Sequence, residues 1–396
     1  MVRFKDFVGV KVVKEINRIG IVGTGLIGKG LAIEIERQSH IKLSRVLTRR
    51  EISTMKDYPF PDVLTNNVEE LLEHCDLVVE CSGDVIYGTE IIDKIMKANL
   101  PVITMNAELQ VTTGSYFAKR GFITEAEGDQ PGCLASLHEN VVQMGFKPLV
   151  YGNIKGFLKL EPTIDEMKYW SKRNGLRLDM TTSFTDGTKV QVEQALVANG
   201  LDAGIAIDGL LALSSDNLDK TGEELAKEAN RIGHPICEFV LAPKAPPGVF
   251  ITAEHDSRQK DVLRYYKMGD GPYYTILQNY HLCHLEIMKT INRVINGGGV
   301  LLNNGKNPSI SVAAIAKRNL QPGEVIEKGI GSFQVRGEAV RKTNHESHVP
   351  IGLLVNAVMT RPIEEGQRIT FDDVELPESL ALEAWMEIVQ QKSTSF

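Results

Sequence analysis

The sequence predicts an α/β protein that begins with a doubly wound parallel sheet. An α+β part and a small β-rich C-terminal part are expected to follow. Near the N-terminus, the glycine-rich turn G-T-G-L-I-G stands between an apolar strand pattern and an amphipathic helix pattern. After about residue 150 the regular alternation of strands and helices stops. We therefore expect three parts, comprising residues 1–150, 151–305 and 306–396.

Composition and charge indicate a soluble globular protein. The chain has 396 residues, of which 42% are apolar and 24% charged, and this length exceeds one ordinary core. The net charge of −7 argues against a protein that wraps nucleic acid. Five scattered cysteines without a Cys-x-x-Cys pair favour a reducing cytoplasm over a disulfide framework or a zinc ribbon. No signal peptide or membrane span is predicted.

The glycine-rich turn has the context of a dinucleotide-binding, or Rossmann, fingerprint. A strand at 19–22 precedes it, and a helix at 29–37 and a strand at 41–47 follow. The first glycine permits the tight turn, the second lets the backbone approach a pyrophosphate, and the third lets the helix pack on the strand. The helix N-terminus also offers N–H groups to phosphates. The predicted cofactor-binding residues of this turn are Gly23, Thr24, Gly25, Leu26, Ile27 and Gly28.

Further cofactor contacts are expected at the ends of the neighbouring strands. The second strand ends in Thr48, Arg49 and Arg50, with no acidic residue in 45–50 to hold the ribose 2′-hydroxyl of NAD. The arginines could pair with a 2′-phosphate, which favours NADP, although NAD stays open and the arginines could be a solvated pair. Strands at 76–80 and 101–106 end at the same sheet edge. Ser82, Gly83 and Asn106 are therefore predicted to line the nicotinamide side.

The stretch T-D-G-T-K-V-Q-V-E, residues 185–193, places charges where a helix begins. Lys189 and Glu193 are four residues apart and share a helix face. The helix behind them, 190–199, is apolar nearly all round, as is typical of a buried helix. Charges on its first turn then require partners or a ligand. Thr188 and Gln191 also have the spacing of a capping box.

Two lysines are the predicted acid–base groups. Transfer of a hydride to or from a hydroxyl or carbonyl carbon requires a proton donor or acceptor at the oxygen and a group that stabilises a developing alkoxide. Lysine can do both if burial lowers its pKa toward neutrality. Lys155, in a glycine-flanked loop, and Lys189 are the candidates, and Asp186 and Glu193 are expected to orient them. The alternative is an exposed Lys189–Glu193 ion pair of ~0.3–0.5 kcal/mol.

A metal site is a weaker prediction, and no ligand set is assigned. Glu125, Glu127 and Asp129 form an acidic cluster that could hold Mg²⁺ or Mn²⁺. His281 and His284 could share a metal, but a role in hydrogen bonding or in approaching the substrate is favoured.

The C-terminal part contains an internal echo. Residues 316–326 are matched 43 residues later by 359–369, each with a basic residue, an apolar residue, a glycine turn and an isoleucine. We expect two similar hairpins in one small β-rich module. The pattern is too short for a solenoid.

Several of these stretches carry a family resemblance. The most specific are 128–132, 152–156, 186–193 with Asn199, 267–274 and 281–286. The chain resembles the homoserine dehydrogenase-like NAD(P)-dependent oxidoreductases with a C-terminal SAF domain, which include 1-deoxy-D-xylulose-5-phosphate reductoisomerase-like enzymes. The resemblance implies a substrate domain at 151–305, a SAF domain at 306–396 and a homodimer or homotetramer without nucleic-acid or membrane partners. The substrate-binding candidates are Asp129, Asn153, Lys267 and His281.

Two departures from the family patterns bear on the substrate. Met105-Asn106-Ala107-Glu108 lacks the lysine that homoserine dehydrogenases carry at this place, and Gln278-Asn279 stands where the reductoisomerase-like members have Arg-Pro. We expect an NADP-preferring oxidoreductase of a polyol, a hydroxy acid or a sugar-derived carbonyl compound. One alternative is a reductoisomerase dependent on a divalent metal. The other is a non-enzymatic NADP-binding sensor or carbohydrate-binding protein.

Overall fold

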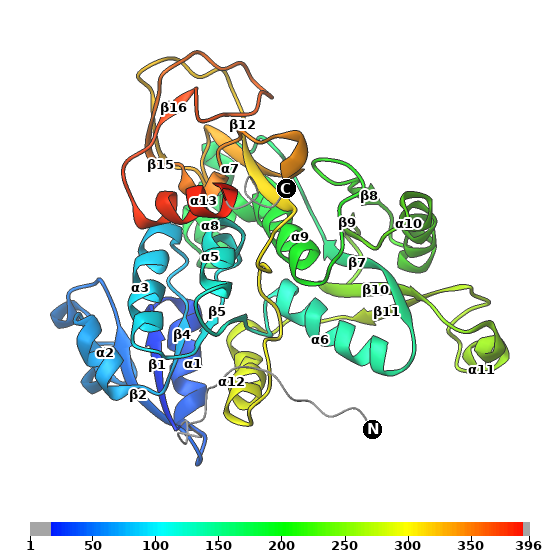
Figure 1. The fold of residues 1–396 in the computed structure, drawn as a ribbon, viewed down its shortest axis with the longest axis horizontal. Helices are drawn as coiled ribbons and strands as arrows, with labels where there is room; N and C mark the ends of the chain where they lie inside the picture. The colour runs from blue at the N-terminus through cyan, green and yellow to red at the C-terminus, as the bar shows by residue number, and fades with distance from the viewer. Residues whose placement is uncertain (1–16, 391–396) are drawn as a thin grey trace.

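The computed structural model describes residues 17–390 (Figure 1). It contains two larger sheets and a C-terminal segment, residues 306–390, with two small sheets. In Figure 1 the first sheet lies at the lower left, the second sheet extends to the right, and the C-terminal segment lies above both. Among residues 17–390, none of the helices is both long and apolar enough to span a bilayer.

The first sheet is parallel throughout and has the order β3-β2-β1-β4-β5-β6. This is the doubly wound order of the Rossmann fold, in which the direction of winding reverses between β1 and β4. The predicted fold class is confirmed. Its strands are β1 (Arg18–Val22), β2 (Lys42–Leu47), β3 (Leu64–Thr65), β4 (Leu77–Glu80), β5 (Val102–Thr104) and β6 (Ile123–Glu125).

Helices cover both faces of the first sheet. On one face α1 (Leu26–Glu36) shares a hydrophobic cluster with α12 (Ile287–Ile295), although α12 lies far along the chain. On the other face lie α2 (Val68–His74) and α3 (Val85–Lys97). A short 3₁₀ turn, Cys283–Leu285, directly precedes α12.

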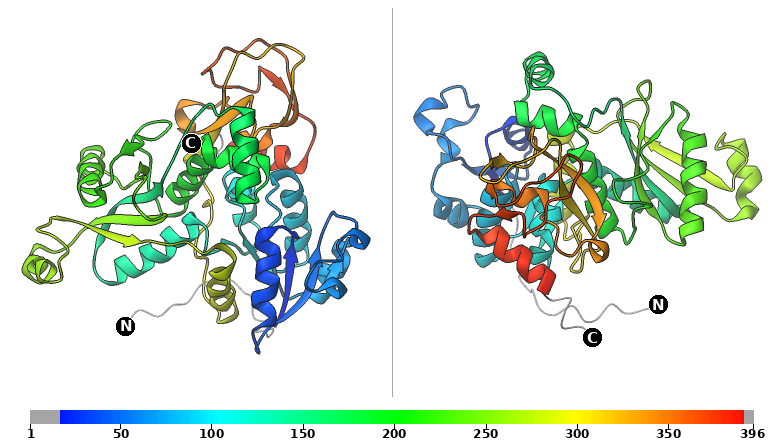
Figure 2. Two further views of the ribbon diagram at one scale, coloured as in Figure 1. Left: turned by 180° about the vertical axis from the view of Figure 1, so that it is seen from behind. Right: turned by 90° about the horizontal axis from the view of Figure 1, so that it is seen from above.

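The second sheet is mixed, with the order β11-β10-β7-β9-β8. Helices α6 and α9 pack on one face and α10 on the other. Figure 2 shows α10 and α11 at the end of the molecule away from the first sheet. The strands are β7 (Lys147–Lys155), β8 (Leu213–Ser214), β9 (Ile236–Leu241), β10 (Gly248–Glu254) and β11 (Tyr273–Gln278). The helices are α6 (Gln130–Gln143), α7 (Ile164–Asn174), α8 (Leu178–Thr185), α9 (Thr188–Gly200), α10 (Leu218–Ile232) and α11 (Lys260–Tyr265).

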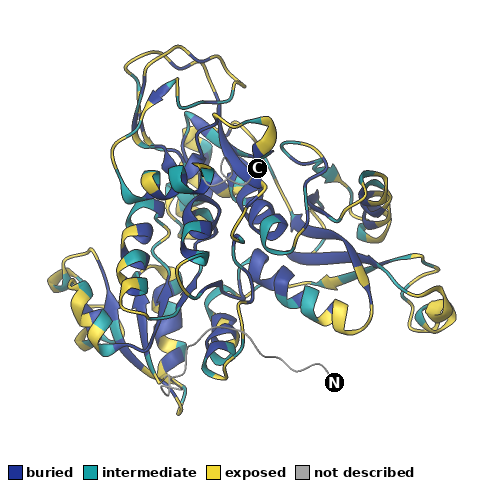
Figure 3. Cartoon of the chain, viewed as in Figure 1, coloured by how far each residue is buried: buried dark blue, intermediate teal, exposed yellow. Residues whose placement is uncertain are grey.

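Helix α9 lies at the centre of the molecule. Most of its ribbon is coloured as buried in Figure 3, as expected from its nearly continuous apolar sequence. One hydrophobic cluster contains residues of α9, of the second sheet and of the C-terminal segment. The C-terminal segment therefore shares its core with the second sheet.

The C-terminal segment consists of two small sheets and a final helix. One sheet pairs β12 with β14, and the other has the order β13-β15-β16. Helix α13 packs against α3 beside the first sheet. The elements are β12 (Ile310–Ala316), β13 (Val325–Lys328), β14 (Val335–Arg341), β15 (Val355–Met359), β16 (Val374–Glu375) and α13 (Leu380–Gln390).

The two copies of the internal echo pair with each other, so the prediction of two separate hairpins is wrong. Leu320 and Ile363, equivalent positions, exchange backbone hydrogen bonds of 2.8 and 3.0 Å. The amide of Gly323 donates to Met359 O and that of Gly366 to Ala316 O, both at 2.8 Å. These reciprocal bonds relate the copies by a local pseudo-twofold axis. The backbone of each copy thus forms hydrogen bonds with the backbone of the other copy.

Candidate active site

The glycine-rich turn connects β1 to α1 in the geometry of a dinucleotide cradle. Gly23 has φ of 109°, which disfavours any side chain. A Cβ on Gly28 would lie 2.2 Å from Gly23 O, so only glycine allows this close packing. A Cβ on Gly25 would meet no atom within 4 Å, so the backbone there is open to a ligand. No side chain caps the N-terminus of α1, whose N–H groups fit a pyrophosphate.

The predicted residues at the end of β2 differ in their contacts: Thr48 is buried, whereas Arg49 and Arg50 are exposed. Thr24 and Thr48 are buried and joined through their hydroxyls at 3.1 Å, which ties the glycine turn to β2. Arg49 lies 3.0 Å from a carboxylate oxygen of Asp84 and stacks 4.2 Å above the ring of Tyr87. Arg50 is exposed. Both arginines are therefore at the edge of the sheet where the second ribose of a dinucleotide lies in this fold.

The ends of β4 and β5 are held by a buried carboxyl group. Glu80 accepts hydrogen bonds from Ser82 N at 2.7 Å and from Thr104 Oγ1 at 2.8 Å, and burial raises its pKa. Both of its oxygens therefore have a hydrogen-bond partner inside the protein. Ser82 and Gly83 follow β4, and Asn106 caps α4 (Ala107–Leu109) after β5. All three lie at the carboxyl edge of the first sheet.

Lys189 is the centre of a charged cluster that joins the two larger sheets. It lies in the first turn of α9, and its side chain is 11% exposed. Its Nζ is 2.9 Å from Asp129, 3.4 Å from Glu108 and 4.0 Å from Glu193. Glu108 follows β5 and Asp129 follows β6, so two of the three carboxylates come from the carboxyl edge of the first sheet.

This environment gives Lys189 an electrostatic character different from the predicted one. Burial alone lowers its pKa, but the nearby carboxylates of Asp129, Glu108 and Glu193 raise it well above the usual value. The lysine is therefore a fixed ammonium ion. The condition under which Lys189 could act as a base, a pKa lowered toward neutrality by burial, is therefore not met, and the sequence did not show how many carboxylates surround it.

Glu193 receives hydrogen bonds from several donors and is almost completely buried. Its Oε2 accepts from Asn153 Nδ2 at 2.7 Å and from Lys155 Nζ at 3.0 Å. With the nitrogen of its amide facing the carboxylates, Gln130 donates to Glu193 Oε1 at 3.2 Å and to Asp129 Oδ1 at 2.6 Å. Burial nevertheless raises the pKa of Glu193. The pKa of Asp129 is lowered: burial opposes ionisation, but Lys189 outweighs it.

Glu125 is a further carboxyl group beside this cluster. It is fully buried at the end of β6, and neither oxygen has a hydrogen-bond partner among the described residues. Burial and the charge of Asp129 raise its pKa well above the usual value. A carboxyl group in such a position is held in its neutral form.

The acidic cluster predicted as a metal site is not assembled. The carboxylate of Glu127 turns away to Lys289, at 2.6 Å, while Asp129 pairs with Lys189. His281 approaches the Gln130 amide at 3.4 Å, whereas the ring of His284 packs against α1 at Gly30. Within residues 17–390, no group of three or more His, Cys, Asp or Glu side chains is arranged to hold a metal ion.

Two predicted site residues lie outside the cluster. The carboxylate of Asp186 points to Lys317 Nζ in the C-terminal segment, at 2.6 Å, because it follows α8 on the side away from Lys189. Lys267 is exposed on the turn between α11 and β11. The predicted capping box of Thr188 and Gln191 is not formed. The N-cap is Gly187, and Asp186 Oδ1 accepts a hydrogen bond from Thr188 N at 2.9 Å.

Glu108 and Gln130 are the cluster residues that the sequence did not predict. Glu108 lies two residues after Asn106, so the rule that selected Asn106, proximity to the end of β5, could also have selected it. Gln130 follows Asp129 directly, but it is uncharged, and the sequence analysis selected catalytic residues by their charge.

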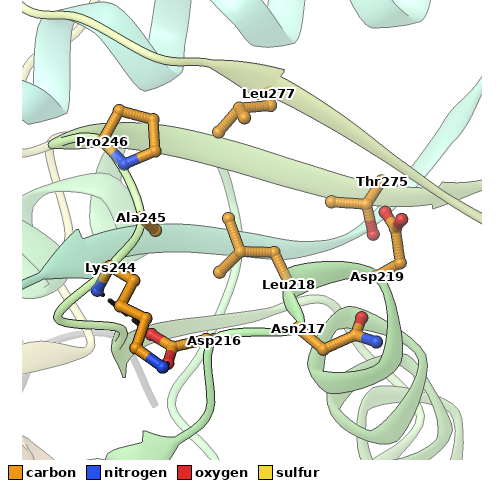
Figure 4. Close-up of a pocket in the computed structure, with 9 residues that line it drawn as sticks. All are labelled: Asp216, Asn217, Leu218, Asp219, Lys244, Ala245, Pro246, Thr275 and Leu277. Atoms are coloured by element: carbon orange, nitrogen blue, oxygen red, sulfur yellow. Dashed lines mark hydrogen bonds and ion pairs between the residues drawn. The ribbon is translucent and has the colours of Figure 1, made fainter.

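A surface cavity of about 550 Å³ lies away from the cluster, between β11, the start of α10 and the loop after β9 (Figure 4). Asp216 and Lys244, which lie next to each other on one side of it, form an ion pair of 3.6 Å (Figure 4). None of the predicted site residues lines it.

Two family models match the chain. Residues 23–118 match the NAD-binding domain of homoserine dehydrogenase, and residues 128–287 match the catalytic domain of oxidoreductase DRL. The protein is an NAD(P)-dependent oxidoreductase. The second match contains Lys155, Lys189 and Glu193, and it speaks against the non-enzymatic alternative. A comparison with curated proteins finds no match.

The oxidoreductase also has similarity to solved structures, at low identity. A probable dehydrogenase from Thermotoga maritima is 16% identical over 72% of this chain and 91% of its own, with a TM-score of 0.41. The UDP-N-acetylglucosamine 3-dehydrogenase GnnA from Acidithiobacillus ferrooxidans is 12% identical over 72% and 91%, with a TM-score of 0.41. A scyllo-inositol dehydrogenase from Lactobacillus casei, solved with NAD(H) and scyllo-inositol, is 13% identical over 74% and 92%, with a TM-score of 0.39. Values this low do not identify a substrate.

Proposed function

We propose that the protein is an NADP-preferring oxidoreductase that interconverts an alcohol and a carbonyl group in a small polyol, hydroxy acid or sugar-derived compound. The observation that supports this best is the Lys189 ammonium, 2.9 Å from Asp129 at the carboxyl edge of the first sheet. In a doubly wound sheet, ligands bind outside this edge. A fixed cation there can stabilise an oxygen that becomes negative during reaction.

Each residue of the cluster has a distinct proposed role. Lys189 and Lys155 place positive charge at the reacting oxygen, and Asp129 orients Lys189. Glu193 holds the proton: its ionised form accepts the hydroxyl proton during oxidation, and its neutral form returns it during reduction. When bound, the nicotinamide cofactor accepts or supplies the hydride at carbon. His281 and Asn153 border the same space and are proposed to contact the substrate.

A substrate rich in hydroxyl groups fits the polar groups around the cluster. Asn153 Oδ1 is buried and receives no hydrogen bond from the described residues, although the amide nitrogen donates to Glu193. A hydroxyl group of the substrate can donate to this oxygen. Buried acceptors of this kind discriminate strongly against analogues that lack the matching donor.

The preference for NADP is proposed from the end of β2. No acidic residue lies in 45–50, and Arg49 and Arg50 are available to a 2′-phosphate at this edge. Arg49 would then exchange its ion pair with Asp84 for the phosphate, or hold both. Equal affinity for NAD and NADP in the wild-type protein would contradict the preference.

The finer family assignment also belongs to the proposal. The internal pairing of residues 316–326 with 359–369 supports a SAF-type module in the C-terminal segment. Cytoplasmic location is proposed on the five scattered cysteines, and homo-oligomerisation on the family resemblance. The reductoisomerase alternative requires a divalent metal. Turnover in the presence of a chelator, equal to that in Mg²⁺ or Mn²⁺, would rule it out.

The test of the proposed function is turnover of a panel of polyols, hydroxy acids and sugar acids with NADP⁺, and of the corresponding carbonyl compounds with NADPH. The wild-type protein is compared with Lys189→Met, Lys155→Met and Glu193→Gln. Because oxidation requires ionised Glu193, its rate is expected to rise with pH through the raised pKa of this group, and Glu193→Gln is expected to remove that limb. Activity that persists in Lys189→Met and in Lys155→Met would refute the assignment.

A further inference from the structure

Helix α9 presents two different surfaces at its first turn. One surface carries Lys189 and Glu193 and faces the charged cluster. The other faces β14 and β12 of the C-terminal segment. The segment is therefore in contact with the same helical turn that holds the cluster, although none of its described side chains forms an ion pair with Lys189.

The C-terminal segment is hydrogen bonded to both ends of α9. At the N-terminal end, Gly337 N donates to Thr188 Oγ1 at 2.9 Å, and Ala339 N donates to Gln191 Oε1 at 2.8 Å. At the C-terminal end, Asn199 Oδ1 accepts from the amides of Ser309 and Ile310, both at 2.9 Å. These bonds fix the helix along its axis and in its rotation.

The turn that precedes α9 is joined to the same segment by a buried ion pair. Lys317 Nζ is 2.6 Å from Asp186 Oδ2 and donates to Ser332 O at 2.5 Å. The side chains are 4% and 0% exposed. The second carboxylate oxygen of Asp186 accepts from Thr188 N at 2.9 Å, so a single carboxylate connects Lys317 to the start of the helix.

We propose that Lys317 is a positioning residue for the active site: through Asp186 it sets the first turn of α9, and with it the placement of Lys189 and Glu193. This inference rests on the proposed function of those two residues. Replacing a buried ion pair by apolar side chains is often neutral or stabilising, so stability alone gives little reason for a buried pair here. Fixing the start of α9 gives it one. The C-terminal segment is thus part of the framework of the active site.

Two variants of the full-length protein test the proposal. Lys317→Met removes the charge and retains most of the side-chain length. Lys328→Met is the matched control, because Lys328 also connects the C-terminal segment to the helical region, through Asp179, but its side chain is 42% exposed and Asp179 lies in the first turn of α8 and not in the turn that precedes α9. Turnover, NADPH affinity and amide hydrogen exchange are measured for both.

In Lys317→Met we expect kcat to fall about 100-fold, because displacements of about 1 Å have effects of this size. KM for NADPH is expected to stay within about twofold, because Lys317 acts on the substrate side only. Amide exchange in residues 186–193 is expected to accelerate at least about tenfold over Lys328→Met, with no change in α1 or α3. The proposal would be overturned if amide exchange in residues 186–193 of Lys317→Met were as slow as in the wild-type protein, or if kcat were equal in Lys317→Met and Lys328→Met.

The double variant Asp186→Asn/Lys317→Met covers the case in which Lys317→Met does not fold. It contains no unpaired buried charge, so its melting temperature is expected to recover. Exchange in 186–193 is expected to stay fast and kcat low. If melting temperature, exchange and kcat all recover in the double variant, the Asp186–Lys317 pair is not needed to position α9, and the proposal is wrong. If no panel compound is turned over, the proposed function fails, whereas the exchange measurement still decides whether Lys317 fixes α9.

Discussion

Lys189 and Lys317 lie on opposite sides of the start of α9, and their surroundings shift their pKa values in opposite directions. Burial lowers the pKa of both, but Lys189 has three carboxylates within 4.0 Å and its pKa is raised. For Lys317 burial outweighs the attraction of Asp186, and Arg336 repels the charge further, so its pKa is lowered. The balance between burial and nearby carboxylates therefore sets the direction in which the pKa of each lysine shifts.

The comparison separates two uses of a buried cation. The excess of carboxylates around Lys189 keeps it charged, which the proposed function requires of a group that stabilises a substrate oxygen. The single partner of Lys317 leaves no charge to spare, which suits a contact that fixes geometry. The following variants test this distinction, in order of decreasing effect.

Lys189→Met is expected to lower kcat by about 10³-fold, as loss of a preorganised group at a developing oxyanion does. Lys189→Arg keeps the positive charge and is expected to recover at least about tenfold of that loss, because a fixed cation needs no exchangeable proton. Steady-state kinetics at several pH values measures both. If Lys189→Arg is as inactive as Lys189→Met at every pH, Lys189 acts by transferring a proton.

Lys317→Met is expected to lower the free energy of unfolding by about 3–5 kcal/mol, because it leaves the carboxylate of Asp186 buried without its cation. Urea denaturation measures this loss. Lys328→Met, which breaks a partly exposed pair, is expected to change the unfolding free energy by about 0–1 kcal/mol. Equal losses in the two variants would mean that burial of the pair has no consequence.

Glu125→Gln tests how burial shifts the pKa of a carboxyl group whose oxygens have no hydrogen-bond partner among the described residues. The folded-state pKa of Glu125 is raised, so above the unfolded value of about 4.5 the native state holds more protons than the unfolded state. This group therefore lowers stability as pH rises, by about 1.4 kcal/mol per pH unit, until its folded pKa is reached. Glutamine mimics the neutral acid, so the variant should lose this slope. An unchanged slope in urea denaturation between pH 5 and about 7 would mean that Glu125 is ionised.

Arg49→Ala has the smallest expected effect. In contrast to the two buried lysines, the side chain of Arg49 is 57% exposed. We expect affinity for NADP to fall about tenfold and affinity for NAD to change little, as loss of one charge-assisted contact to a phosphate predicts. Fluorescence titration with NADPH and NADH measures both. An equal fall for the two cofactors would place Arg49 away from the 2′-phosphate.

Local patterns of the sequence predicted the first sheet well. The turn from Gly23 to Gly28 and its flanking strand and helix depend on neighbours in sequence, and a glycine in each place has a steric reason. Lys155, Lys189 and Glu193 were also predicted and are brought together, because a charge at the end of a buried helix must have partners.

Contacts between distant segments could not be predicted. Asp186 lies three residues before Lys189, yet the turn at Gly187 directs its carboxylate to Lys317, 131 residues away in sequence. The sequence shows that both residues are charged but not which side of the turn each occupies. Lys267 lay in a stretch typical of the family, but no pattern within α11 or β11 gives its distance from α9.

The position of α12 has a consequence for how the chain is made. Its residues Ile287 and Ile291 complete a hydrophobic cluster on α1 and the first sheet, but they follow more than 150 residues after β6. On the ribosome, the apolar face of the nucleotide-binding half therefore stays uncovered until most of the chain has been translated. Nascent chains that end before Ile287 are expected to present this face to molecular chaperones, and chains that include Ile295 are expected to release them.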